Sequence, residues 1–323
     1  MAAALNAALA DALAEDDRTL VFGEDVGALG GVFRITDGLQ AKFGRERVFN
    51  TPVAEAGIAG LCVGLAIAGW RPVAEMQFDA YSYPALEQII DHVAKYRNRS
   101  RGRIPMPVTI RMPAFGGIRG KEHHGESPET YYVHTAGLKV VVPSGPLDAY
   151  RLLRMSIADP DPVIFLEPKS RYGVSEEGEL DPKGDPIGRA RVLREGDVCV
   201  LVSYGAMVAV CLDAAVALGA EGIACSVIDL RSLVPLDVDT IIERVRAAGR
   251  VVVVHEAPRT LGMGAEVSAR ITESAFDRLR APVARVTAPD VPYPPPSLEA
   301  EFRPGVERVL EAVRRTVAVD RAI

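Results

Sequence analysis

The sequence is poor in the residues that mark several protein classes. It has four cysteines among 323 residues, each lies in an apolar run, and no pair has the CxxC spacing of a zinc or redox motif. We therefore predict buried free thiols, as is typical of a cytoplasmic protein. An excess of basic residues is also missing, because the net charge is −6 and the pI is about 5.5. This balance argues against nucleic acid as a partner.

Long apolar runs are missing as well. The run at 56–70 contains only Gly and apolar residues, but it is shorter than the roughly 18 residues expected of a membrane-spanning helix. The N-terminal MAAALNAALADALAEDD has no basic region and carries acids early, so we predict a helix over residues 2–14 and not a signal peptide. We expect no membrane partner.

The chain also lacks a dinucleotide fingerprint. The glycine-rich stretch DVGALGGVFR at 25–34 does not have the GxGxxG spacing. Gly262 and Gly264 follow the apolar run VVVV and HEA, but no acid about 20 residues later completes the motif. A nicotinamide-dependent oxidoreductase is therefore a weak alternative, which a nucleotide-binding titration would test.

What the chain does contain is a regular alternation of strand and helix patterns. Examples are the predicted strands TLVFGED, RPVAEMQF and MPVTIRMP and the predicted helices over 84–100 and 146–159. The stretch SEEGELDPKGDPIG is acidic, has no apolar period and predicts a linker. We expect an α/β protein with two domains, 1–175 and 190–323, joined by a linker at 176–189. Each domain should be a mainly parallel sheet with helices on both faces. The proline-rich tail VPYPPPSLEAEFRPG should lie irregularly across a neighbouring surface.

The stretch NTPVAEAGIAGLCVGLAIAGW (50–70) predicts an unusual helix. Thr51 can cap it and Pro52 suits its first turn. A helix that is apolar all round belongs in a core or a subunit interface, and Gly60 and Gly64 lie on one face where another backbone can approach. Glu55 is its one ionisable group. If it is buried, its pKa should rise and it could donate or share a proton; the alternative is an ordinary first-turn acid favoured by the helix dipole.

Ligands of open parallel sheets bind beyond the carboxyl ends of the strands. Several candidates follow predicted strands there: Glu55, Gln77, Phe78, Tyr81 and His124. Tyr81 could stack on a flat ring, Gln77 could hydrogen-bond one and His124 could carry a proton.

Each of these assignments has a structural alternative. Phe78 and Tyr81 could be ordinary core residues. His123 could be an incidental surface histidine, and we expect His134 and His255 to be structural.

At this point the motifs are similar to those of a known family. FGEDVGALGGVFR, NTPVAEAGIAG, EMQFDAYSYPALEQI, HHGESPETYYVHTAGLKVVVP, VIFLEPKSRY, VIDLRSLVPLD and HEAP resemble the β subunits of thiamine-diphosphate-dependent 2-oxo acid dehydrogenases, the decarboxylating component of those complexes. The resemblance runs nearly end to end. QFDAYSYP, FLEPK and HEAP are most similar to the branched-chain branch. The fold implied is a transketolase-like pyrimidine-binding domain followed by a transketolase C-terminal-like domain.

The resemblance implies roles for the candidates. Glu55 matches the glutamate that hydrogen-bonds N1′ of the cofactor's aminopyrimidine, and Gln77, Phe78 and Tyr81 match the segment beside that ring. His124, in HGESPE, matches the histidine of HSQSPE, which is placed where a lipoyl group is acylated. This chain has Gly125 and Glu126 where the family often has Ser and Gln.

Cofactors and partners also follow from the resemblance. Thiamine diphosphate would be shared with an α subunit, in a tetramer of two α and two β chains, and the acyl group would pass to the lipoyl domain of a dihydrolipoyl acyltransferase core. The superfamily holds magnesium with Gly-Asp-Gly and a later Asn, and this chain contains no GDG, so magnesium would be held mainly by the α subunit. Some members also hold potassium, at positions that match Val108, Thr109, Ser156, Asp159 and Asp161; the last replaces a more usual Asn.

Two alternatives to a branched-chain enzyme stay open on the sequence. One is the β subunit of a pyruvate or acetoin dehydrogenase, which has the same fold and chemistry. The other is a non-catalytic binding subunit, which Gln in place of Glu55 would have favoured; the acid is present.

Overall fold

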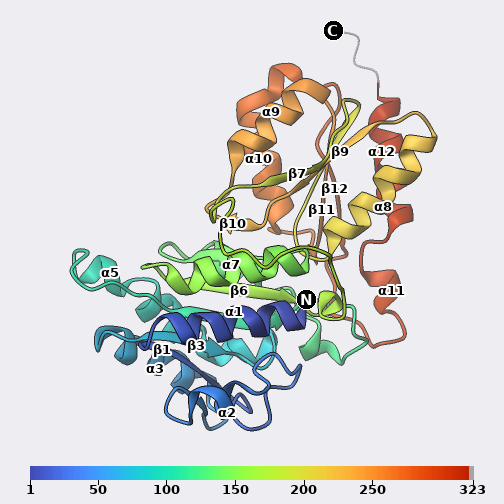
Figure 1. Ribbon diagram of the computed structural model, residues 1–323. Helices are drawn as coiled ribbons and strands as arrows, with labels where there is room; N and C mark the ends of the chain where they lie inside the picture. Colours follow the sequence, from blue (N-terminus) through green and yellow to red (C-terminus); the bar gives the residue numbers. More distant parts are fainter. Residues whose placement is uncertain (320–323) are drawn as a thin grey trace.

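The computed structural model describes residues 1–319, and two sheets organise them (Figure 1). The first has seven strands in the order β10-β5-β6-β4-β3-β1-β2. All of its neighbours pair in parallel except β10, which is antiparallel to β5. Its strands are β1 (Thr19–Gly23), β2 (Val48–Asn50), β3 (Arg71–Glu75), β4 (Thr109–Ala114), β5 (Lys139–Val141), β6 (Val163–Pro168) and β10 (Ser232–Val234).

The second sheet has five strands in the order β12-β11-β8-β9-β7, and only β7 is antiparallel to its neighbour. They are β7 (Arg191–Arg194), β8 (Cys199–Ser203), β9 (Cys225–Asp229), β11 (Val251–Pro258) and β12 (Ala284–Ala288). The predicted fold class, two α/β domains with mainly parallel sheets, is confirmed. The predicted domain limits stay a prediction, and β10 departs from them: it lies beyond residue 190 but pairs with β5.

Helices cover both faces of each sheet. On the first sheet, α1 (Ala2–Glu15) and α7 (Pro146–Ala158) pack together against one face, and α3 (Glu55–Ile67) packs on the other. On the second, α8 (Met207–Ala220) and α12 (Val306–Ala318) cover one face, and α9 (Val238–Ala248) and α10 (Met263–Ala275) cover the other. Short helices include α2 (Leu39–Phe43), α6 (Glu129–Val133) and α11 (Glu299–Phe302).

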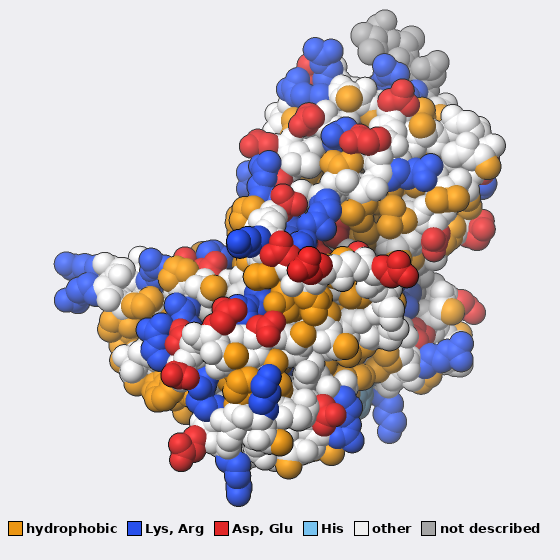
Figure 2. Space-filling view, viewed as in Figure 1, with side chains coloured by type: hydrophobic (Ala, Val, Ile, Leu, Met, Phe, Trp, Pro, Cys, Tyr) orange, Lys and Arg blue, Asp and Glu red, His pale blue; other side chains and the backbone are white. Residues whose placement is uncertain are grey.

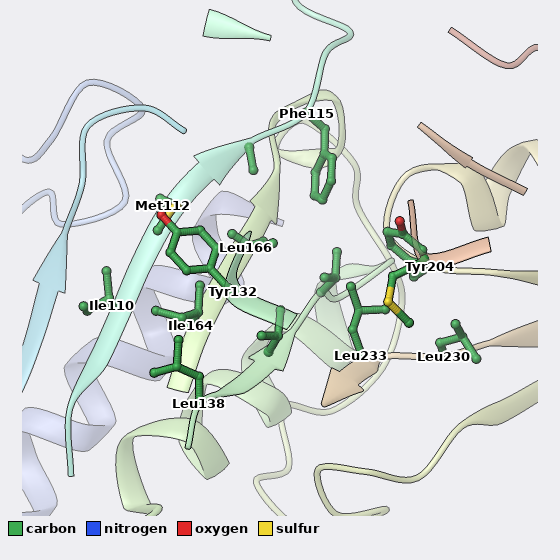
Figure 3. Packing of buried hydrophobic residues seen from close by; sticks show 14 of the residues in the cluster. Ile110, Met112, Phe115, Tyr132, Leu138, Ile164, Leu166, Tyr204, Leu230 and Leu233 are labelled. Atoms are coloured by element: carbon green, nitrogen blue, oxygen red, sulfur yellow. The ribbon is translucent and has the colours of Figure 1, made fainter. Parts of the chain in front are cut away.

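One buried cluster runs from the first sheet into the second. Figure 3 shows Tyr132 and Leu166 of the first part of the chain on one side, with Tyr204 and Leu233 of the second part nearby. Because both sheets contribute to this apolar cluster, the two parts of the chain pack on each other and are not merely tethered.

The helix predicted over 84–100 is wrong as a single element. The segment is instead a 3₁₀ helix η1 (Ala80–Ala85), one turn α4 (Leu86–Gln88), a π turn η2 (Ile89–Val93) and α5 (Tyr96–Arg99). Pro84 lies inside η1, and regular α-helical hydrogen bonding is interrupted further on, at the π turn over Ile89–Val93. The π turn then carries Ile89 and Val93 into the core.

The start of α3 is also later than predicted. The N–H of Thr51 donates to the carbonyl of Gly23 at 3.0 Å, so the chain is still extended there and Thr51 cannot cap a helix. Instead α3 begins at Glu55 after Ala54, with no side-chain cap.

Within this chain, α3 is buried on one face and exposed on the other. The helix buries Ile58 and Cys62 against the core, but Leu61 and Ile67 are 39% and 44% exposed. A Cβ added at Gly64 would meet nothing within 4 Å. The prediction for this helix was a core or a subunit interface. Its exposed apolar outer face fits a subunit interface.

Three further predictions can be checked. All four cysteines are free and buried, as expected. The segment after β12 does lie across the first part of the chain, through hydrogen bonds from Gly117 and Arg119 to Glu299, although α11 gives it one short helix. Among residues 1–319, no helix is long and apolar enough to cross a membrane, and Figure 2 shows acidic and basic side chains interspersed over the face in view.

Candidate active site

The carboxyl ends of the parallel strands bring most of the candidates to one edge of the first sheet. Gln77 and Phe78 follow β3, the His124 loop follows β4, and Glu24 follows β1. Because β3, β4 and β6 are neighbours in the sheet, side chains beyond their ends face a common space. This is the edge at which open parallel sheets bind ligands.

An aromatic cluster forms the centre of this edge. The rings of Phe78 and His124 meet edge to face with centroids 4.3 Å apart, and Phe78 and Tyr81 do the same at 5.4 Å. The hydroxyl of Tyr81 lies 3.3 Å from Nε2 of His124. The structure therefore brings three of the predicted residues into direct contact.

His124 itself is half-buried, and its Nδ1 is buried without a hydrogen-bond partner. Burial, and then the nearby charges of His123 and Lys169, lower the pKa of His124 below its usual value. The imidazole is therefore neutral near pH 7, and its Nδ1 is left to hydrogen-bond a ligand or a partner chain.

A buried ion pair lies under this cluster. Nζ of Lys169 and Oδ2 of Asp79 are 2.6 Å apart, and both side chains are fully buried. Asp79 precedes η1 and also accepts from the N–H of Ala80 at 2.9 Å, while Lys169 follows β6. The pair therefore ties the ends of β3 and β6 across β4. Nζ of Lys169 also lies 6.0 Å from the ring centroid of Phe78.

Replacing Lys169 with Met should raise the pKa of His124, because it removes a nearby cation and leaves the Asp79 carboxyl unpaired. An NMR titration of the His124 imidazole would measure this. Lys95→Met is the matched control, since Lys95 is exposed to solvent and pairs with Asp91 on a remote turn. An unchanged or lower His124 pKa in Lys169→Met would contradict the coupling.

Glu55 lies beside the cluster and not in it. It is the first residue of α3, which packs against η1, the element that carries Tyr81. Its side chain is half-buried in this chain, so the prediction of a carboxylate entering a dry helix is wrong for the chain alone. The reason is the exposed outer face of α3.

A second acid near Glu55 was missed by the sequence reasoning. Glu24 is 5% exposed and its Oε1 has no hydrogen-bond partner. Burial, and then the charges of Glu55 and Asp25, raise the pKa of Glu24. The signal was available in FGED, where two acids follow a buried strand directly. The pairing of Asp79 with Lys169 was also missed. Each residue follows a strand, but the two are far apart in sequence.

The remaining polar candidates have defined partners. Nε2 of Gln77 donates to Asp25 at 3.3 Å. The hydroxyl of Tyr83 donates to Glu126 at 3.3 Å. Burial raises the pKa of Glu126. This second acid of the His124 loop therefore faces a tyrosine and not the histidine.

The other histidines differ from His124. His255 is fully buried on β11, and burial lowers its pKa to about 4, which fits the predicted structural role of a neutral core side chain. His134 is exposed after α6, so it does not belong to the core. His123 is half-exposed and stacks on Tyr81 with centroids 5.8 Å apart.

The residues proposed for potassium lie at the opposite edge of the sheet, near the start of β4. Lys139 donates to both oxygens of Asp159, at 2.8 and 2.6 Å, and Arg97 pairs with Asp161. The carboxylate charges are thus already compensated, and among the described residues no group of three or more His, Cys, Asp or Glu could hold a metal. Thr109 Oγ1 is buried without a partner. A cation here would need that oxygen and main-chain carbonyls, including those of Val108 and Ser156, and the site stays a prediction.

Comparisons with known proteins agree with this architecture. Residues 1–175 match the family described as the transketolase pyrimidine binding domain, and residues 188–309 match the transketolase C-terminal domain. A solved structure described as a split-gene transketolase, an inactive β4 tetramer, superposes with a TM-score of 0.80 at 26% identity and covers 98% of both chains.

Two curated relatives extend over nearly the whole chain. The 3-methyl-2-oxobutanoate dehydrogenase subunit beta of Mycobacterium tuberculosis (strain CDC 1551 / Oshkosh) is 53% identical over 98% of this chain and 91% of its own length. The pyruvate dehydrogenase E1 component subunit beta of Leifsonia xyli is 48% identical over 98% of this chain and 94% of its own length. The chain therefore belongs to the family of β subunits of thiamine-diphosphate-dependent 2-oxo acid dehydrogenases.

Proposed function

We propose that this chain is the β subunit of a branched-chain 2-oxo acid dehydrogenase. Together with an α subunit it would decarboxylate a branched 2-oxo acid oxidatively and pass the acyl group to a lipoyl domain. The observation that carries this proposal is the placement of Glu55, Tyr81, Phe78 and His124 at or beside one strand-end edge of a fold whose full-length relatives are β subunits of such enzymes.

The residues at this edge fit the pyrimidine side of thiamine diphosphate. Phe78 and Tyr81 offer aromatic surface, and His124 Nδ1 and Glu24 Oε1 are buried polar atoms without partners. Such orphaned atoms are costly unless a ligand or a partner chain satisfies them. When bound, the cofactor supplies the nucleophilic carbon and the electron sink that decarboxylation needs.

Each residue then has a role that its chemistry allows. Glu55 would hydrogen-bond the pyrimidine nitrogen N1′ and hold a proton there. Gln77, fixed by Asp25, and Tyr81 would orient the ring. His124, which is neutral near pH 7, would exchange a proton with the group that receives the acyl chain.

The metal half of the site is what this chain lacks. Its two Gly-Asp pairs are not followed by Gly, and neither lies at a strand end of the candidate site. Asp185 is exposed in the segment before β7 and pairs weakly with Arg191 at 3.4 Å, and Asp197 is exposed. We infer that an α subunit supplies the magnesium ligands, with the exposed apolar face of α3 at the shared interface. A tetramer of two α and two β chains bound to a dihydrolipoyl acyltransferase core is the assembly expected.

The isolated chain should bind thiamine diphosphate poorly. A diphosphate needs compensating positive charge, and this chain offers a net charge of −6 and no metal site of its own among the described residues. We expect the Kd to fall at least about tenfold when the α subunit is added, a change of about 1.4 kcal/mol in binding free energy. Calorimetric titration with the cofactor and magnesium measures both values. Equally tight binding by the chain alone would contradict the half-site.

Substrate choice is the finer part of the proposal. The M. tuberculosis relative is named for 3-methyl-2-oxobutanoate and the L. xyli relative for pyruvate. Fitting two extra methyl groups into an apolar pocket is worth about 1–3 kcal/mol for each methylene-sized difference. We therefore expect kcat/KM for 3-methyl-2-oxobutanoate to exceed that for pyruvate at least about tenfold. Assays of the αβ pair with both acids decide this, and a pyruvate advantage would assign the chain to the pyruvate branch.

A further inference from the structure

A segment near the end of the chain crosses from the second sheet to the loop that carries His124. We call residues 291–303 the C-terminal strap and residues 115–126 the His124 loop. Figure 1 shows the chain running from β12 past the first domain and through α11 before it returns to α12. The strap buries Tyr293, Glu299 and Phe302 to within 8% exposure. It therefore packs on the molecule and is not a free tail.

The start of the His124 loop has amides that no regular structure can satisfy. Phe115, Gly117 and Arg119 have φ values of 69°, 99° and 55°, so the backbone turns sharply and its N–H groups leave the sheet. A buried N–H without an acceptor is costly. The acceptors have to come from elsewhere in the fold.

Two acids of the second domain are those acceptors. Glu299 in the strap accepts from the N–H of Gly117, and from that of Arg119 at 2.8 Å. Glu256 at the end of β11 accepts from the N–H of Gly116 at 2.6 Å. Arg303 of the strap holds Glu256 in turn, with Nε 2.8 Å from Oε1.

Glu299 is ionised in this setting. Burial alone would raise its pKa, but hydrogen bonds from Tyr293, Gly117 and Arg119 outweigh burial and lower the pKa of Glu299. Hydrogen bonds from N–H groups to a carboxylate are about twice as strong as neutral ones. The strap therefore binds the loop more firmly than packing alone would.

The strap also touches the loop next to the histidine. A Cβ added at Gly125 would lie 2.3 Å from Cζ of Tyr293, so the tyrosine ring occupies the space that a side chain at 125 would need. The hydroxyl of Tyr293 donates to Glu299. This contact gives a physical reason for glycine at the position immediately after His124.

We propose that the C-terminal strap is the positioning element of the His124 loop, with Glu299 and Tyr293 as positioning residues for His124. Glu299 and Glu256 fix the start of the loop, and Tyr293 packs against it beside His124. The second domain thereby sets where the imidazole lies at the edge of the first sheet. The inference rests on the proposed function for its catalytic meaning, but the contacts can be tested without turnover.

The test compares Glu299→Ala with Glu301→Ala in the full chain. Glu301 lies on the same short helix and is exposed, so it is the matched control. Amide hydrogen exchange followed by mass spectrometry should show residues 115–126 of Glu299→Ala exchanging at least about tenfold faster than in the wild type, with β4 and α12 unchanged. The Glu301→Ala variant should match the wild type. Unchanged exchange in the loop of Glu299→Ala would overturn the proposal.

Turnover gives the second readout, with the α subunit added. Glu299→Ala should lower the lipoyl-linked activity about 10- to 100-fold and change decarboxylation with an artificial electron acceptor much less, because a displaced catalytic group costs rate without abolishing cofactor binding. Equal losses in both assays would overturn the positioning role. If the wild type decarboxylates no 2-oxo acid, the proposed function fails, while the exchange result still decides the role of the strap.

Two further variants test the same contacts in case Glu299→Ala does not fold. Tyr293→Phe removes only the hydroxyl that donates to Glu299 and should raise loop exchange by a smaller factor. Gly125→Ser should displace the Tyr293 ring and raise loop exchange, but should add nothing in a Tyr293→Ala background, since coupled residues give non-additive effects. Additive effects in this cycle would show that the Tyr293–Gly125 contact does not hold the loop.

Discussion

Replacing Glu55 with Gln is expected to lower decarboxylation of the αβ pair by at least about 10²-fold, the lower range for loss of a general acid or base. Gln has nearly the same shape but cannot hold or share a proton. Thermal melting should stay close to that of the wild type, because the side chain is only half-buried and α3 begins without a side-chain cap that the change could remove. The measurement is turnover with an artificial electron acceptor, beside the melting curve.

The matched control for this change is Glu46→Gln. Glu46 is an exposed acid in the loop before β2, so the same loss of charge there should leave turnover unchanged. A folded Glu55→Gln variant with near-normal turnover would remove Glu55 from the site. A variant that melts much earlier than the wild type would instead point to a structural role for the acid.

The position of Glu55 shows what the sequence could and could not predict about this site. The acid at the head of an apolar helix is visible in the sequence, and so is the preceding strand. The start of the helix is not, because Thr51 continues the hydrogen bonding of β1 and that pairing is long-range. The sequence left α3 open between a core and a subunit interface, because an apolar pattern has the same appearance whether its partner is in the same chain or another one.

The other residues at this edge of the sheet also include some that the sequence predicts and some that it does not. Short apolar runs predicted β1, β3 and β4, and the rule that ligands bind at strand ends then selected Gln77, Phe78 and Tyr81. The Asp79–Lys169 pair and the contact of Glu299 with the His124 loop join residues about 90 and 180 positions apart. No local pattern encodes such contacts. The π turn after Pro84 was not predicted, because the apolar pattern of the sequence does not reveal a single turn that contains one extra residue.

The neutral state of His124 also connects the two halves of the proposed reaction. Burial and the charges of Glu55 and Asp25 raise the pKa of Glu24, while burial and the charges of His123 and Lys169 lower the pKa of His124. We thus propose proton exchange with the cofactor for Glu55 and proton exchange with the acyl acceptor for His124, which are different groups in different surroundings. Such a separation of environments is a common feature of acid–base sites. It predicts that the two half-reactions can be impaired separately.

Replacing His124 with Ala is the sharpest test of that separation. We expect acyl transfer to the lipoyl domain to fall by about 10²–10⁴-fold, the range for loss of a general acid or base, while decarboxylation with an artificial acceptor falls much less. The wild-type lipoyl-linked rate should be nearly independent of pH above the lowered pKa of His124 and change only below it, since the neutral imidazole persists there. His134→Ala is the control, because His134 is exposed after α6 and lies outside the aromatic cluster. Equal losses in both assays for His124→Ala would place the histidine in cofactor binding and not in acyl transfer.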